Sequence, residues 1–164
     1  MSALHLPAGG GAVHPFLGTT MTVKAGGPET GDRLTVIEQE CPPGFATPLH
    51  VHRDDDEAFY VLSGTARMHC GERSWQVAAG AFVLLPRRVP HAFANDQDAP
   101  LRLLQLTWPA GFEHFAAEVA AGDVDPGRLA EVAARHGYQV IGPPPDAAVR
   151  PPAHLPPPCP EESS

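Results

Sequence analysis

The sequence has few basic residues and no long apolar run, and each shortage excludes a class of protein. Eleven lysines and arginines stand against 19 aspartates and glutamates, which gives a formal net charge of −8. Nucleic-acid backbones and anionic membranes recruit basic patches, so this balance argues against both as partners. No window holds about 18 consecutive apolar residues, so we expect no membrane span. No basic stretch followed by an apolar one opens the chain, so no secretory signal is expected and the predicted location is the cytoplasm.

Cysteine is also scarce, with Cys41, Cys70 and Cys159 as the three copies. An odd number without a C-x-x-C pair excludes a zinc site built from thiolates and argues against a disulfide framework. Charged residues make up 18% of the chain and hydrophobic residues 43%, which suits a packed core better than a disordered chain. The length of 164 residues predicts one domain.

Glycine and proline, in contrast, are abundant, with 16 and 20 copies. So many helix breakers favour short strands joined by turns. Runs of strand-forming residues bounded by turn residues cover Thr19–Ala25, Leu34–Cys41, Ala58–Leu62, Thr65–Cys70, Ser74–Val77, Ala81–Leu85 and Leu101–Trp108. Short strands at such close spacing predict an all-β sandwich or barrel over residues 19–110.

The two ends of the chain have a different character. Residues 1–18 are rich in glycine, proline and histidine and are interpreted as a loose N-terminal arm. Residues 111–141 predict a helical segment and a last strand packed on the barrel: Gly111–Ala121 has helical spacing, and Pro126–His136 follows a capping Asp125. Residues 142–164 form a proline-rich tail that we predict to be disordered.

The triplet His50-Val51-His52 is the most informative motif. Residues two apart on a strand point to the same face, so both imidazoles would stand side by side, as a chelating pair requires. Glu57 opens the next strand, where a hairpin could return its carboxylate beside the histidines to make a site suited to a non-haem metal. The alternative from these residues alone is a solvated histidine pair followed by an acidic loop.

The wider spacing resembles a known family. The two segments are Gly44-x5-His50-x-His52-x4-Glu57-x6-Gly64 and Gly80-x5-Pro86-x4-His91-x3-Asn95. They resemble the two signature motifs of the cupin superfamily, and small bacterial cupins described as quercetin-dioxygenase-like in particular. One position departs from the pattern: Arg88 stands where the second motif usually has glycine.

This resemblance implies a cupin-type antiparallel β-barrel, or jelly roll, with a metal inside. It implies His50, His52, Glu57 and His91 as metal ligands. Such a set suits one divalent ion per chain, with Fe, Mn, Co, Ni and Zn all open. By strand alternation Phe59 would share the inward face of Glu57, and Phe93 that of His91. These two rings are candidates for a pocket that takes an aromatic small molecule, and ordinary barrel core is the alternative.

Three functions follow from the resemblance. The first is a dioxygenase acting on a flavonol-like, other aromatic or polyketide substrate, whose hydroxyl binds the metal and gives its proton to Glu57 as general base. The second is a non-redox zinc enzyme, either a polyketide cyclase or an isomerase. The third is a metal-dependent binding module for a small molecule. The resemblance also implies a homodimer.

Overall fold

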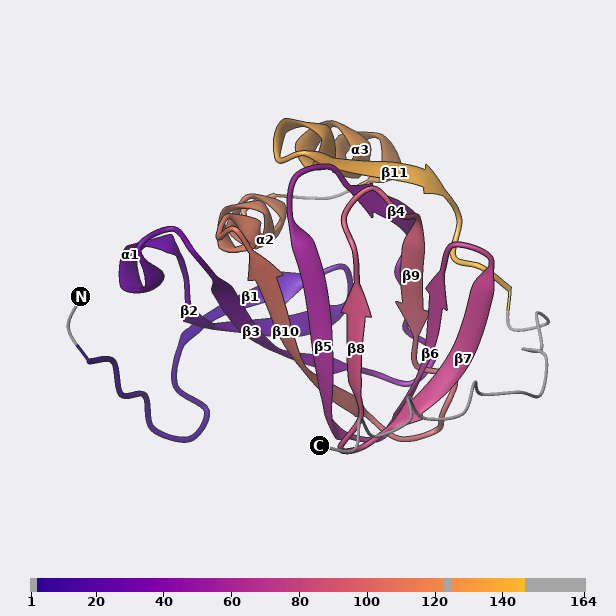
Figure 1. The fold of residues 1–164 in the computed structure, drawn as a ribbon, viewed down its shortest axis with the longest axis horizontal. Helices are drawn as coiled ribbons and strands as arrows, with labels where there is room; N and C mark the ends of the chain where they lie inside the picture. The colour runs from indigo at the N-terminus through magenta and orange to yellow at the C-terminus, as the bar shows by residue number, and fades with distance from the viewer. Residues whose placement is uncertain (1–2, 123–124, 147–164) are drawn as a thin grey trace, which may run out of the picture.

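A computed structural model describes residues 3–122 and 125–146, and these form two antiparallel sheets that face each other, with two longer helices at one end (Figure 1). The six-stranded sheet has the order β1 (Ala12–Phe16), β2 (Thr19–Ala25), β3 (Thr35–Cys41), β10 (Leu101–Trp108), β5 (Asp56–Ser63) and β8 (Phe82–Leu85). The five-stranded sheet has the order β11 (Tyr138–Gly142), β4 (Leu49–His52), β9 (His91–Ala94), β6 (Thr65–Cys70) and β7 (Arg73–Ala78). The helices are α1 (Gly27–Thr30), α2 (Phe112–Ala120) and α3 (Pro126–Arg135). The predicted jelly-roll β-barrel with a short C-terminal helical segment is confirmed.

Period-two alternation places the core between the sheets. In β5 the residues Glu57, Phe59 and Val61 are buried, while Tyr60 and Leu62 on the other face are exposed. One core cluster, which includes Phe59, Phe93 and Met68, fills the space between the sheets.

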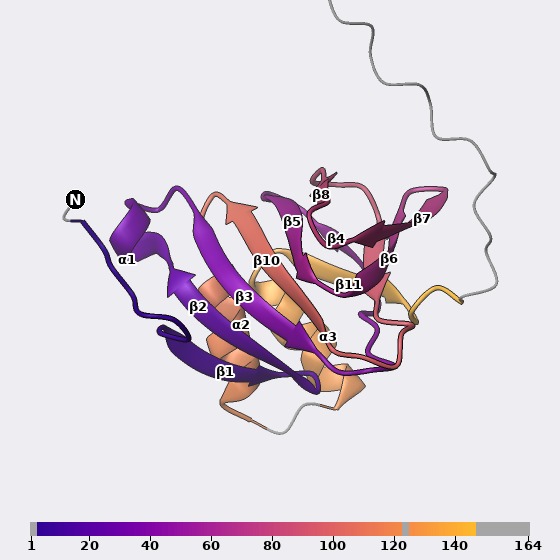
Figure 2. The same cartoon turned by 90° about the horizontal axis from the view of Figure 1, so that it is seen from below.

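A second cluster lies where α2 and α3 pack over the inner face of β1, β2 and β3 (Figure 2). It joins Phe16 and Met21 of the sheet to Phe115 and Val119 of α2 and to Tyr138 of β11. The helical segment therefore closes one end of the barrel.

The interpretation of residues 1–18 as a loose arm is wrong in its second half. Ala12–Phe16 forms strand β1, which pairs antiparallel with β2. Pro15 obscured this strand in the sequence, since proline breaks a ladder in a central strand but is tolerated at an edge such as β1. Phe16 anchors the strand, because its ring is buried against Phe112 and Phe115.

Local signals at α3 agree with the sequence analysis. The helix begins at Pro126, and the Asp125 side chain accepts a hydrogen bond from the Arg128 backbone N–H at 2.9 Å. Gly137 follows with a positive φ of 83°.

The predicted disordered tail lies outside the described residues from 147 onward. Within the described part of the chain, no helix has the length and apolar character needed to cross a bilayer.

One outer surface of the barrel is apolar. Tyr60 and Leu62 of β5 and Phe82 and Leu84 of β8 are between 38% and 61% exposed, and Tyr60 lies opposite Phe82 in the ladder. Strand β8 is the edge of its sheet. We call these four residues the β5–β8 patch.

Candidate metal centre

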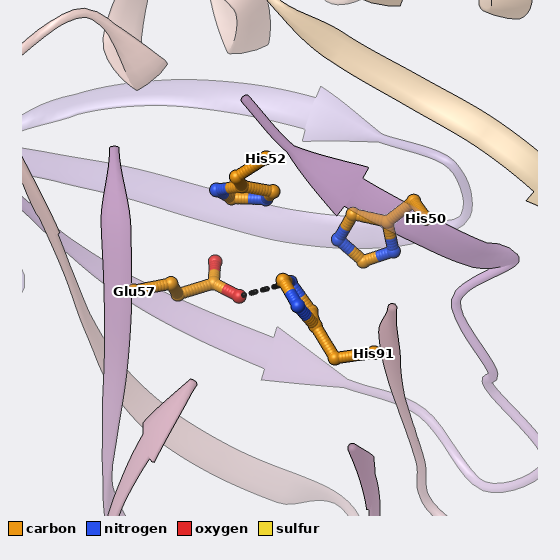
Figure 3. Close-up of side chains that lie close together, drawn as sticks. All are labelled: His50, His52, Glu57 and His91. Carbon is orange, nitrogen blue, oxygen red and sulfur yellow. Dashed lines mark ion pairs between the residues drawn. The ribbon is translucent and has the colours of Figure 1, made fainter. Parts of the chain in front are cut away.

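The four residues that the resemblance nominates converge inside the barrel (Figure 3). His50 and His52 come from β4, Glu57 from β5 and His91 from β9. Their nearest ligand atoms all lie within 4.8 Å of one another. The sheet register explains part of this, since His50 pairs directly with His91 between β4 and β9.

Each histidine ring is held through Nδ1. The Nδ1 atoms of His50 and His91 lie 2.9 Å from the carbonyl oxygens of Pro48 and Val89, respectively. His52 Nδ1 lies 2.9 Å from Asp55 Oδ2. An Nδ1–H bonded to an oxygen fixes the tautomer in which Nε2 carries the free lone pair, as in histidines that ligate metals.

The Nε2 atoms of His52 and His91 are buried and have no hydrogen-bond partner among the described residues. Leaving a buried polar atom without a hydrogen bond costs roughly 1–3 kcal/mol of folding stability. Two such imidazole nitrogens beside the Glu57 carboxylate therefore indicate that a ligand binds here. A divalent cation would satisfy both and balance the charge of Glu57. The residues present therefore fit a metal ion.

Asp55 has a role that the sequence did not reveal. The run of Asp54, Asp55 and Asp56 suggested a solvated acidic loop as one alternative. In the structure Asp55 is buried against His52, while Asp56 pairs with Arg87 through an oxygen–nitrogen distance of 2.7 Å. The loop thus orients a candidate ligand and fastens β5 to the turn that precedes His91.

The Glu57 carboxylate is buried and bonded on one side. Its Oε1 accepts a hydrogen bond from Gln105 Nε2 at 2.7 Å, and its Oε2 lies 3.4 Å from His91 Nε2. Burial acts to raise the pKa of Glu57, but the neighbouring imidazoles of His52 and His91 outweigh it and hold the pKa below the usual range. The group is therefore an anion near neutral pH.

The electrostatics of the two β4 histidines differ. Burial, together with the nearby imidazoles, lowers the pKa of His50 to about 3, so its ring is neutral and ready to ligate. Burial also acts to lower the pKa of His52, but Glu57 and Asp55 outweigh it and raise the pKa. A metal ion at this position would have to displace the proton that the two carboxylates favour.

An apolar pocket is lined by three of the four residues, His50, His52 and Glu57. Phe59 and Phe93 both line it, as the pocket interpretation expected, and both also belong to the barrel core. The N-terminal strands and residues 111–141 supply a further wall, which includes Phe16, Met21, Phe112, Phe115, Leu129 and Tyr138. The pocket is partly open to solvent, and its volume is about 50 Å³. That is room for a few waters, whereas pockets for drug-sized ligands measure ~300–1,000 Å³.

The motif residues outside the site shape the turns that carry it. Arg88, at the usual glycine position, has a positive φ of 65°, and its N–H donates to the His52 carbonyl at 2.7 Å. The backbone therefore keeps the left-handed turn at Arg88, although the Cβ atom of a non-glycine residue makes that conformation less favourable. Asn95 is fully buried, and its Nδ2 lies 2.9–3.1 Å from the carbonyl oxygens of Cys41, Pro42 and Ala99. It fastens the end of β9 to the loop that leads to β4.

Fold, site and comparison define the class of protein. Residues 37–107 match the family model described as a cupin domain, a range that contains all four converging residues. An RmlC-like cupin from Shewanella frigidimarina superposes with a TM-score of 0.58 at 16% identity, over 68% of this chain and 96% of that one. Residues 37–107, which carry the four converging residues, match the cupin domain, and the described residues have the cupin fold.

Two relatives in sequence extend the comparison. Quercetin 2,3-dioxygenase of Bacillus subtilis is 28% identical over 147 residues, which is 90% of this chain. This chain spans only 37% of the length of that enzyme. An uncharacterised protein of Methanocaldococcus jannaschii is 28% identical over 89 residues, which cover 54% of this chain and 70% of that protein.

Proposed function

We propose that this cupin is a metal-dependent dioxygenase that acts on a hydroxylated aromatic substrate. The observation that carries the proposal is the convergence of three imidazoles and one carboxylate at the base of a pocket walled by aromatic rings. Four protein ligands leave room for substrate on a five- or six-coordinate ion, as a catalytic site needs. The similarity to quercetin 2,3-dioxygenase over 90% of this chain supports the choice of reaction.

The metal ion, when bound, would lower the pKa of a coordinated hydroxyl and promote the reaction with O₂. His50, His52 and His91 would hold it through Nε2, and Glu57 through Oε2. Glu57 Oε2 would accept the hydroxyl proton of the substrate on the lone pair that does not bind the ion, since Oε1 is already bonded to Gln105. The rings of Phe59, Phe93 and Phe112 bind the aromatic face and exclude water.

The volume of the pocket sets a condition on the substrate. A space of about 50 Å³ accepts a small group but not a three-ring flavonol without movement. Phe112, Phe115 and Leu129, from α2 and α3, form the part of the wall that can shift without breaking a sheet ladder. Flavonols are the first compounds to test because of the similarity, and single-ring catechols and phenols follow.

The test begins with metal content, measured by elemental mass spectrometry on protein purified without a histidine tag. Protein loaded with Fe, Mn, Co or Ni is expected to consume O₂ when substrate is added, and Glu57→Gln is expected to abolish this uptake. Glu72→Gln, in an exposed turn, is the matched control and should retain it.

Two outcomes would overturn the proposal. Zinc-loaded protein that converts substrate without O₂ would identify a non-redox cyclase or isomerase. Tight binding of a small molecule without product, under every metal, would identify a binding module.

We also propose that the protein forms a homodimer through the β5–β8 patch. The patch has no charged side chain among its four residues, so a two-fold contact between identical copies would bring no like charges together. Exposed apolar surface of this kind beside an edge strand marks association sites.

The expected result is that Phe82→Glu converts a dimer into a monomer in light scattering. Glu72→Gln, away from the patch, should leave the mass unchanged. A wild-type protein that is monomeric at micromolar concentration would contradict the dimer.

A further inference from the structure

Gln105 is a buried polar residue in an otherwise apolar stretch of β10. It points inward with Leu101 and Leu103, and only 2% of its surface is exposed. It lies opposite Phe59 of β5 and Ile37 of β3, both fully buried. Burial of an amide costs roughly 1–3 kcal/mol unless its hydrogen bonds are made, so this position needs a reason.

The contact of Gln105 supplies that reason. Its Nε2 lies 2.7 Å from Glu57 Oε1, across 48 residues of sequence. The amide nitrogen only donates and the carboxylate only accepts, so the amide must present N–H to Glu57. The opposite amide orientation would place Gln105 Oε1 beside Glu57 Oε1, and the two oxygens would repel each other.

The two carboxylate oxygens of Glu57 are consequently different. Oε1 is engaged by Gln105, whereas Oε2 lies among the imidazoles, 3.4 Å from His91 Nε2. The terminal torsion of a glutamate is broad, so nothing intrinsic to the side chain selects one oxygen. The selection comes from the neighbouring strand.

We propose that Gln105 is a positioning residue. Its amide N–H holds Glu57 Oε1 in a hydrogen bond, so that only Oε2 faces the metal ion and the hydroxyl of the substrate. The inference rests on the proposed metal-dependent function and deepens it. Without the amide the carboxylate is free to turn, so Oε2 is no longer held toward the metal ion and either oxygen can enter the position that the substrate needs. Gln105 therefore controls how many coordination positions stay open.

The chain offers a matched control in Gln39 of β3. It has the same side chain, is 1% exposed and lines the same pocket. Its Nε2 donates to Thr19 Oγ1 at 3.1 Å rather than to Glu57. A general need for buried amides in the barrel would affect both residues, whereas the positioning role affects Gln105 alone.

The experiment titrates wild type, Gln105→Leu and Gln39→Leu with Co²⁺ and records affinity and the visible absorption of the bound ion. Loss of an outer partner of a metal ligand weakens binding ~10–100-fold, and we expect this for Gln105→Leu with an altered absorption band. Gln39→Leu should keep the wild-type affinity and spectrum. Melting curves establish that each variant is folded, and Gln105→Met replaces Gln105→Leu if the latter does not fold.

The outcomes separate the inference from the function on which it rests. Gln105→Leu with wild-type affinity and spectrum would overturn the positioning role and leave the metal centre intact. A wild-type protein that binds no Co²⁺ would overturn the metal centre itself. Equal losses in Gln105→Leu and Gln39→Leu would show a structural effect and also overturn the positioning role.

Discussion

Replacing His91 by alanine is expected to lower the affinity of the protein for divalent metal ions by more than about 100-fold. Changes in the outer partners of a ligand alone cost ~10–100-fold, and this change removes a ligand. The ring centroid of His91 lies 4.5 Å from that of His50 and 4.9 Å from that of His52, at the centre of the group. In the described part of the chain, the group holds no histidine besides His50, His52 and His91 that could replace the lost ring.

Metal-dependent thermal stabilisation measures this loss without any substrate. An ion that binds only the folded state at 100 times its Kd adds ~2.7 kcal/mol to stability, so the wild type should melt at a higher temperature with Co²⁺. His91→Ala should show no such rise. His69→Ala is the matched control, because His69 lies on β6 with its Nδ1 2.8 Å from Ser74 Oγ, outside the group. A full metal equivalent retained in His91→Ala would contradict the site.

Replacing Glu113 by alanine is expected to destabilise the fold by about 3 kcal/mol or more. The buried carboxylate accepts hydrogen bonds from the backbone N–H groups of Gly27 at 2.7 Å and Gly111 at 2.9 Å, and from the Thr35 hydroxyl. Hydrogen bonds to a charged group contribute ~1.5–3 kcal/mol each. Truncation removes the acceptor of the Gly27 N–H and of the Thr35 hydroxyl, while the Gly111 N–H keeps a hydrogen bond to Thr35 Oγ1 at 3.1 Å. Glu113 thus ties the start of α2 to the first residue of α1 and to β3.

The effect should depend on pH in a defined direction. Burial acts to raise the pKa of Glu113, but hydrogen bonds from Thr35, Gly27 and Gly111 outweigh it and lower the pKa. A carboxylate with a lowered pKa in the folded state stabilises fully above its unfolded pKa and loses that contribution as pH falls through the folded pKa. The gap between wild type and Glu113→Ala should therefore shrink below about pH 4.

Urea unfolding at pH 7 and in acid measures that gap. Glu118→Ala, on the same helix, is the control, since Glu118 forms an exposed pair with Arg135 and its loss should matter far less. Equal stability of Glu113→Ala and wild type at pH 7 would contradict the role of Glu113.

The candidate site shows which contacts local spacing can predict. The separation of His50 and His52 by one residue puts both rings on one face of β4, because side chains alternate along any strand. Phe59 shares the inward face of Glu57 for the same reason. His91 and Glu57 reach these histidines from other strands. The hairpin argument had suggested Glu57, and the resemblance to a motif named all four residues together.

Gln105, Asp55 and Tyr138 show where spacing fails. Gln105 meets Glu57 because β10 and β5 are neighbours in a sheet, and an inward amide in an apolar strand was the only signal of it. In the sequence Asp55 is typical of a solvated acidic run, whereas in the structure its carboxylate bonds to the His52 ring. Tyr138 packs 4.5 Å from the His52 ring because β11 pairs with β4, a pairing between segments more than 80 residues apart.

The sequence by itself determined the class of fold and the inward faces of its strands, because alternation, turn residues and capping residues act over a few positions. Tertiary structure alone decided that Ala12–Phe16 joins the sheet, that α2 and α3 narrow the pocket, and that Gln105 bonds one oxygen of Glu57. These depend on which strands become neighbours. That choice is made by burial of the whole apolar surface at once, and no short stretch of the chain encodes it.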